Sequence, residues 1–428
     1  MPGHLVGAAH REMLEQVAND TPNERLRRRA RLLLLYDDGL LTHEAAREAG
    51  ISDSRARYWK RQYQARGLAI FGKGHSAPSE EPKSDTSVAA PAQNPSPPCY
   101  DLARFAVETA RQAGPGVQAG EPLAEAGRKV WRYQLAHMLL HEPGTLLGED
   151  MEELHDMRVA IRRLRAACAV FSPAFLPKAL QKHLKGLRRT GRTLGKVRDL
   201  DVFIEKARRY QATLPPEHRP ALAPLLHTWA AARDAARQEL VAYLHSRRYQ
   251  AFKAKFYAFV STPGAGALPA PAAMSVPYLV REAAPALIYA CLASVRAFDA
   301  LLPQATLEQF HALRIAFKNL RYTLEYFREV LGEEVKAVIN EIKGLQDHLG
   351  DLNDAHVAAG ILRDFLAQWD ALQAQKPVAE RHTPEPVLAY LSSQYAERQH
   401  LMLAFQETWA HFSRPKLREK LAKAISVL

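Results

Sequence analysis

The sequence predicts an all-α protein, in which two pseudosymmetric four-helix bundles follow a small three-helix unit with a helix-turn-helix. Three observations lead to this prediction. Ala, Leu, Arg, Glu and Gln dominate and runs of β-branched residues are scarce, which favours helices over strands. A helical pattern of 13 residues occurs twice, once from His155 and once from His311. A stretch rich in Pro and Ser separates a short N-terminal part from a long C-terminal part.

The N-terminal part, residues 1–71, has the pattern of three short helices between Arg25 and Phe71. Thr42 is placed to cap the second helix, and Gly50 to end it. Ser52 is placed to cap the third helix after a sharp turn of small residues. The arrangement resembles the homeodomain-like helix-turn-helix of transposases and some regulators. This resemblance implies that the last helix docks on duplex DNA.

In such a complex, one face of the last helix contacts the major groove or the DNA backbone. We expect this face to consist of Ser54, Arg55, Arg57, Tyr58, Lys60 and Arg61. The opposite face packs inward through Ala56, Trp59 and Tyr63. Because this fold is also reused for protein contacts, a small helical adaptor that has lost DNA contact is the alternative.

Residues 72–98 contain many Pro, Ser, Ala and charged residues and few large apolar ones, so they are predicted to form a flexible linker. The larger part, residues 99–428, divides into halves at about 120–260 and 272–428, with Ser261–Pro271 between them. Each half has an amphipathic segment, around 130–140 and 279–298, ahead of its copy of the repeat. A second shared pattern follows each copy, since Leu194-Gly195, Asp199 and Val202 recur as Leu349-Gly350, Asp354 and Val357. Each half is therefore expected to be a bundle of about four helices, related to the other by a pseudo-twofold axis.

The two copies of the repeat read HDMRVAIRRLRAA and HALRIAFKNLRYT. In both, one histidine and three cations lie at positions i, i+3, i+7 and i+10, which form one narrow stripe on a helix. The opposite face is apolar in both copies, and a phenylalanine, Phe171 or Phe327, ends each helix. One face therefore packs into the bundle and the other presents cations. The two stripes are His155, Arg158, Arg162 and Arg165, and His311, Arg314, Lys318 and Arg321.

The positive charge around the first copy is not balanced by acidic residues. Twelve Arg and Lys residues lie between His155 and Arg198, and Asp156 is the one acidic residue among them. An exposed helix face is usually stabilised by acidic partners one turn away, so this field indicates an anionic ligand. Arg matches phosphate oxygens with a planar fork, and cations spaced one turn apart can follow an extended chain. Since no glycine-rich phosphate loop is present, the pattern indicates a polyanion.

These motifs resemble the two halves of a CHAD domain, the conserved-histidine α-helical domain, over roughly residue 120 to the C-terminus. The resemblance implies non-catalytic binding of inorganic polyphosphate in a basic groove or pore between two helical bundles. It implies a ligand-facing set made of both stripes, with Arg188, Arg198 and Lys343 as further candidates. Because Glu325 and other glutamates dilute the charge of the second half, we expect the first half to bind the ligand more strongly.

Two alternatives to a polyphosphate-binding protein remain. The chain could be a DNA-binding regulator whose bundle is a sensor or a scaffold, or a phosphohydrolase. The sequence shows no metal–carboxylate cluster for hydrolysis, so no catalytic residue and no cofactor is expected. Asp199 and Asp354 are expected to cap or pair with a neighbouring helix. His137 and His141 have the spacing of helical zinc ligands, but no further ligand supports them, so no metal site is predicted.

The composition of the chain indicates its cellular compartment and the kinds of partner that it binds. The formal net charge of +12 suggests an anionic polymer, an acidic membrane surface or an acidic partner. Three scattered cysteines fit a reducing compartment. The N-terminus lacks the pattern of a secretory signal, and no apolar run is long enough to span a bilayer. We therefore expect a cytoplasmic protein without a membrane partner, compatible with association with polyphosphate granules or the nucleoid.

Overall fold

The computed structural model describes residues 101–270 and 277–428, and in the N-terminal part residues 6, 8–20, 24–51, 56, 59, 60, 63, 64 and 68. The chain divides into two compact units, Met1–Asn94 and Pro95–Leu428, and the division falls inside the predicted linker, whose residues 72–98 lie outside the described residues. The described residues are almost entirely helical and contain no β-strand, as predicted. None of their helices is long and apolar enough to cross a membrane.

The N-terminal unit contains α1 (Ala8–Asp20), α2 (Glu24–Asp37) and α3 (Thr42–Ala49) around its own apolar core. Helix α3 ends at Gly50, which has a φ of 66°, as the sequence predicts. The predicted N-cap is wrong by one residue, because Leu41 is the N-cap and Thr42 is already helical. The carboxylate of Glu44 accepts the N–H of Leu41 at 3.1 Å, so this helix end is stabilised without a threonine cap.

The first half of the larger unit is built from α6 (Leu123–Leu147), α7 (Met151–Val170), α8 (Pro177–Thr213) and α9 (Ala223–His245). The shorter helices α5 (Leu102–Ala110) and α10 (Arg247–Ser261) pack on α6. Residue Gly127 allows α6 to approach the end of α7, because a Cβ atom there would lie 2.8 Å from Cβ of Phe171.

The second half repeats this order with α11 (Val280–Arg296), α12 (Leu307–Phe327), α13 (Glu334–Ala367) and α15 (Glu385–Phe412). The short helix α14 (Trp369–Ala374) connects α13 to α15, and α16 (Pro415–Ile425) packs on α13. Short 3₁₀ helices join several α-helices, namely η2 (Ser172–Ala174), η3 (Pro216–Leu222), η4 (Leu302–Gln304), η5 (Arg328–Val330) and η6 (Val378–Glu380). The predicted four-helix plan of each half is therefore confirmed, with additional short helices.

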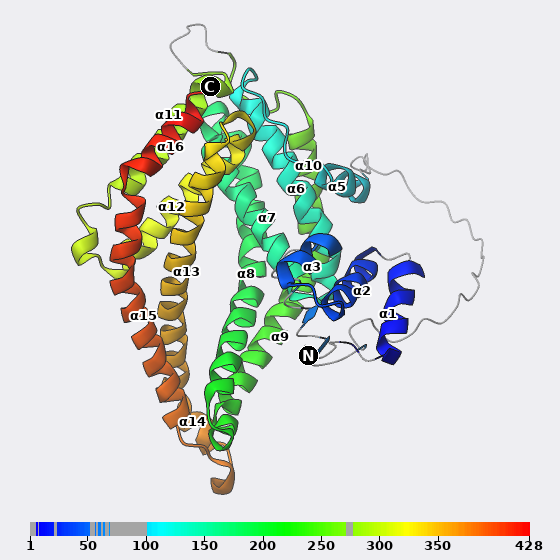
Figure 1. The fold of residues 1–428 in the computed structure, drawn as a ribbon, viewed down its shortest axis with the longest axis vertical. Coiled ribbons are helices and arrows are strands. Elements are labelled where there is room, and N and C mark those ends of the chain that lie inside the picture. Colours follow the sequence, from blue (N-terminus) through cyan, green and yellow to red (C-terminus); the bar gives the residue numbers. More distant parts are fainter. Residues whose placement is uncertain are drawn as a thin grey trace, which may run out of the picture. The chain divides into compact units, whose positions relative to one another are not determined.

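The two halves meet through equivalent residues, as expected at a pseudo-twofold axis. The rings of Phe171 and Phe327, which end the two copies of the repeat, lie edge to face with centroids 5.6 Å apart. Where α6 and α11 begin, Leu123 N–H donates to the carbonyl of Tyr278, and Val280 N–H donates to the carbonyl of Glu121, both at 2.9 Å. Helices α7 and α12 therefore lie side by side at the centre of the unit (Figure 1).

A second apolar cluster joins the halves at the other end of the long helices. It brings Phe203 and Trp229 of the first half against Leu362 and Trp369 of the second. Figure 1 shows α8 and α13 running in the same direction toward this end, where α14 lies. The halves are thus held together both at α7 and α12 and at the far ends of α8 and α13.

Candidate anion-binding site

The two cationic stripes face each other across the contact between α7 and α12. Burial lowers the pKa of Lys318 on α12, and the positive charges of Arg314, Arg162 and Arg165 lower it further. Two of these three arginines belong to α7, so cations from the two helices lie close enough to repel one another. The same holds for Arg158, whose pKa is lowered by burial and, against the opposing effect of Asp199, by Arg162, Arg198 and Arg314.

Helix α8 adds a third row of cations. Burial lowers the pKa of Arg165, and Arg188 and Arg192 of α8 lower it further. The structure therefore brings the predicted residues Arg188 and Arg198 close to the first stripe. Arg192 also joins them although it was not predicted as a site residue, and its position one turn after Arg188 is the signal that could have found it. The predicted site residue Lys343 lies exposed on α13. It is not among the cations that lower the pKa values of Arg158, Arg165 and Lys318.

Several guanidinium groups in this region have buried N–H donors without a hydrogen-bond acceptor among the described residues. They include Nε of Arg162 and Nη1 of Arg198. A buried donor without a partner costs about 1–3 kcal/mol, and more when it is charged. Donors of this kind, gathered with like charges, form a site that an anion with several oxygens would stabilise.

Two carboxylates already lie among these cations. Asp199 of α8 accepts from Arg158 of α7 at 3.2 Å, and Asp354 of α13 accepts from Lys206 of α8 at 3.0 Å. The prediction that both aspartates pair with a neighbouring helix is therefore confirmed. The two carboxylates are also close enough to affect each other. Burial raises the pKa of Asp199, the charge of Arg158 lowers it, and the negative charge of Asp354 raises it further.

The second stripe is weaker than the first because Glu325 neutralises part of it. Glu325 accepts from Arg321 one turn before it and from Arg163 of α7, each at 3.2 Å. The equivalent position in the first copy is Ala169, so Arg165 has no such partner on its own helix. Arg321 was predicted to face the ligand, and the structure places it against Glu325 with 18% of its side chain exposed.

The two repeated histidines have different surroundings. His311 is exposed, and its Nδ1 lies 3.0 Å from Oδ1 of Asn353 on α13. A hollow of about 340 Å³ adjoins it, with Phe310 and His356 among its lining residues. His155 is half-buried on α7 and lies near the carboxylates of Glu152 and Asp156.

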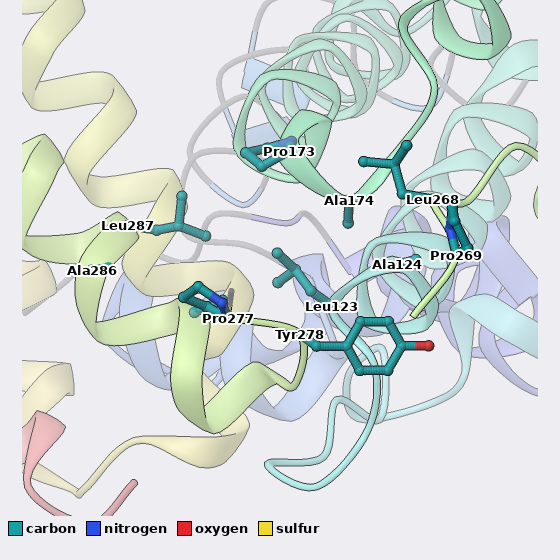
Figure 2. A pocket seen from close by; sticks show the side chains of 11 residues that line it. Leu123, Ala124, Pro173, Ala174, Leu268, Pro269, Pro277, Tyr278, Ala286 and Leu287 are labelled. Carbon is teal, nitrogen blue, oxygen red and sulfur yellow. The ribbon is translucent and has the colours of Figure 1, made fainter. Parts of the chain in front are cut away.

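A cleft near the junction of the halves does not suit phosphate. It has a volume of about 440 Å³ and lies where α6 and α11 begin (Figure 2). Its walls are hydrocarbon side chains, prolines and Tyr278, and Leu123 and Leu287 point toward the same space. Such a surface cannot compensate the charge of a phosphate group.

The predicted DNA-contacting residues are largely outside the described residues, namely Ser54, Arg55, Arg57, Tyr58 and Arg61. Lys60 is half-buried, and its ammonium group lies 4.4 Å from the centre of the Tyr36 ring. Ala56, Trp59 and Tyr63 are buried, as predicted for the inner face of the last helix.

Comparison with known proteins agrees with this organisation. The model of the CHAD domain matches residues 129–363, and the model of a homeodomain-like domain matches residues 23–70. Among solved structures, the CHAD domain from the plant Ricinus communis is 24% identical, covers 74% of this chain and 96% of its own, and has a TM-score of 0.49.

The protein PptA from Streptomyces chartreusis is 19% identical, covers 68% of this chain and 100% of its own, and has a TM-score of 0.52, a likeness that concerns the fold alone. No curated protein matches the chain. Since the CHAD-domain model spans more than half of the 428 residues, the chain belongs to the CHAD-domain family.

Proposed function

We propose that the larger unit binds inorganic polyphosphate, without catalysis, in a groove lined by α7, α8 and α12. The observation that carries this proposal is the gathering of cations from three helices, where burial first and then the neighbouring positive charges lower the pKa values of Arg158, Arg165 and Lys318. Such an arrangement lowers the stability of the free protein unless a ligand supplies the missing negative charge.

The length of the cationic rows favours a chain over a single phosphate. The stripe from His155 to Arg165 spans ten residues of helix, or about 15 Å at a rise of 1.5 Å per residue. A single phosphate ion would contact one or two of these cations and leave the others repelling each other. A linear polyanion can contact them all, and its release of condensed counterions would add to the binding free energy, as it does for nucleic acids.

The site can be tested by reversing two charges of the first stripe. We expect the double variant R158E/R162E to lose binding of long-chain polyphosphate, measured by fluorescence anisotropy at several salt concentrations. The control R247E/R248E makes the same change in net charge at two exposed residues of α10. Acidic residues are favoured in the first turn of a helix, so this control should fold and bind as the wild type does.

Wild-type affinity in R158E/R162E, or an equal loss in the control, would show that the ligand is not held by these cations. The same samples test the absence of catalysis, because incubation with Mg²⁺ or Mn²⁺ should leave the chain length of the polyphosphate unchanged. Release of orthophosphate would instead indicate a phosphohydrolase.

A second function, DNA binding by the N-terminal unit, is favoured by the match to a homeodomain-like domain and by the buried residues of its last helix. In this case the bundle acts as a sensor or a scaffold of a regulator. We expect the full-length protein to shift duplex DNA, and R57E/R61E to abolish the shift while R158E/R162E retains it. If neither wild type nor R158E/R162E shifts any DNA of a genomic fragment pool, the unit is an adaptor.

A further inference from the structure

Four side chains of metal-binding types gather where α7 begins, at the end of the first cationic stripe. Glu152, His155 and Asp156 of α7 each offer one atom, and these three atoms all lie within 4.8 Å of one another. The fourth side chain comes from α6, because Nε2 of His141 lies 3.9 Å from Oδ2 of Asp156. The sequence pairs His141 with His137, whereas the structure pairs it with Asp156.

The environment of His141 orients it as a ligand. Its Nδ1 lies 2.9 Å from Oε2 of Glu153, a carboxylate that is only 7% exposed. An ionised carboxylate can only accept a hydrogen bond, so when His141 is neutral its proton is on Nδ1 and its lone pair is on Nε2, the nitrogen that lies near Asp156. A histidine ligand of a metal is usually held in this way by a carboxylate on its other nitrogen.

A glycine makes room for this supporting carboxylate. A Cβ atom at Gly144 of α6 would lie 2.4 Å from Cγ of Glu153, so any other residue would displace Glu153 from His141. His137, one turn before His141, is not part of the cluster. Its pKa is lowered to about 4 by burial and by the charges of His141 and Arg163, and its ring contacts Tyr133.

The four groups match a tetrahedral ion with nitrogen and oxygen ligands. Zinc binds imidazole and carboxylate at about 2.0–2.2 Å, which places neighbouring ligand atoms about 3.4 Å apart. The atoms of Glu152, His155 and Asp156, which lie within 4.8 Å of one another, would have to move inward by about 1 Å, and the ring of His141, now 3.9 Å from Asp156, would have to approach the other two as well. Two imidazoles favour Zn²⁺ or a similar transition metal over Mg²⁺ and Ca²⁺, which prefer oxygen ligands.

The place of the cluster connects it to the proposed ligand. Glu152 and Asp156 put two negative charges at the end of a row of cations that would otherwise attract phosphate, and His155 belongs to both groups. Arg198 of the cationic rows lies beside the cluster, with its Nη2 4.0 Å from Oε1 of Glu152. A divalent cation would reverse the sign of this end of the groove.

We propose that His141, Glu152, His155 and Asp156 bind a divalent transition-metal ion of the zinc type, and that a phosphate oxygen of a bound polyphosphate adds to it as a fifth ligand. The contact between the metal ion and polyphosphate rests on the proposed function, whereas the metal site itself does not. The metal joins the ligand to the protein at the end of the first stripe.

The metal site is tested first without polyphosphate. The full-length protein, stripped of metal with a chelator, is titrated with Zn²⁺ by calorimetry, and with Co²⁺, whose visible absorption reports tetrahedral coordination. We expect one equivalent to bind, and D156N and E152Q each to weaken binding about tenfold or more. The control D234N removes an exposed carboxylate of α9 and should bind as the wild type does. Equal Zn²⁺ binding by D156N and the control, or no saturable binding, would overturn the proposal.

The coupling to polyphosphate is tested with the same proteins. Zn²⁺ should raise the polyphosphate affinity of D234N and not that of D156N, and D156N should still bind polyphosphate in a chelator. R158E/R162E should bind Zn²⁺ as the wild type does. Loss of polyphosphate binding without loss of Zn²⁺ binding in that variant separates the two sites, so a failure of one proposal can be distinguished from a failure of the other.

Discussion

Replacing Asp199 by asparagine should strengthen polyphosphate binding, although the change removes an ion pair. In the free protein Asp199 accepts from Arg158 at 3.2 Å, so it occupies one of the cations that the ligand needs. The pair is partly open to solvent, with 33% and 57% of the two side chains exposed, and such pairs contribute about 0.2–1 kcal/mol. D199N makes this cation available to the ligand at little loss of stability.

A second contribution comes from the charge of Asp199 itself. A carboxylate about 6 Å from a phosphate charge repels it by about 0.7 kcal/mol when the solvent's dielectric constant applies. Together the two effects amount to about 1–1.5 kcal/mol, which corresponds to an affinity about five- to tenfold higher. Polyphosphate affinity should be measured by anisotropy at fixed salt for the wild type, D199N and D234N, in which an exposed aspartate of α9 is replaced.

The same carboxylate predicts a pH dependence. Burial, and to a smaller extent Asp354, raise the pKa of Asp199, while Arg158 lowers it, with a net rise. Asp199 therefore takes up a proton at a higher pH than an ordinary aspartate, and its repulsion of the ligand ends there. As the pH falls toward this pKa, the wild type should approach the affinity of D199N. If D199N and D234N bind alike, or D199N binds less tightly than the wild type, Asp199 does not compete with the ligand.

Three further predictions concern the second stripe, the core and acid stability. E325Q should raise polyphosphate affinity a few-fold by releasing Arg163 and Arg321, and should lower the free energy of unfolding by about 1–3 kcal/mol, both measurable on one protein sample. G127A should destabilise by about 1–3 kcal/mol in urea denaturation, because its Cβ would lie 2.8 Å from Phe171, whereas a stabilisation would show that the crossing can relax. The pKa values of His137 and His183 are lowered to about 4, chiefly by burial, so the unfolded chain binds more protons between pH 4 and 6.5, and the free energy of unfolding should fall as the pH falls through that window. H183Q should flatten this pH dependence.

Much of the fold follows from local pattern. The spacing of apolar and cationic residues predicts the faces of α7 and α12, and the recurrence of Asp199 as Asp354 predicts the shared plan of the halves. Pairing of both aspartates with other helices could also be predicted, because a carboxylate beside a basic helix has partners on either side.

The details of the site depend on contacts between residues that are distant in sequence, and no periodicity encodes these. Arg163 and Glu325 form an ion pair across the junction of the two halves, so the neutralisation of Arg321 could not be read from the stripe alone. The sequence shows His141 at the spacing of helical zinc ligands with His137 and predicts no metal site there. In the structure the ring of His141 lies instead beside Glu153 and Asp156 of α7.

The contact between Phe171 and Phe327 has a consequence for the direction in which a ligand lies. The twofold axis runs along the helices, because equivalent residues lie side by side and α8 and α13 run in the same direction, so a ligand that crosses from one stripe to the other meets the same series of groups from either end. Linear inorganic polyphosphate has no chemical direction, unlike a nucleic acid strand, and a symmetric site could accept it in either of two equal ways. Glu325 on one side and Ala169 on the other remove that equality. Duplication within a single chain, unlike assembly from two identical subunits, lets one wall of the site change without the other.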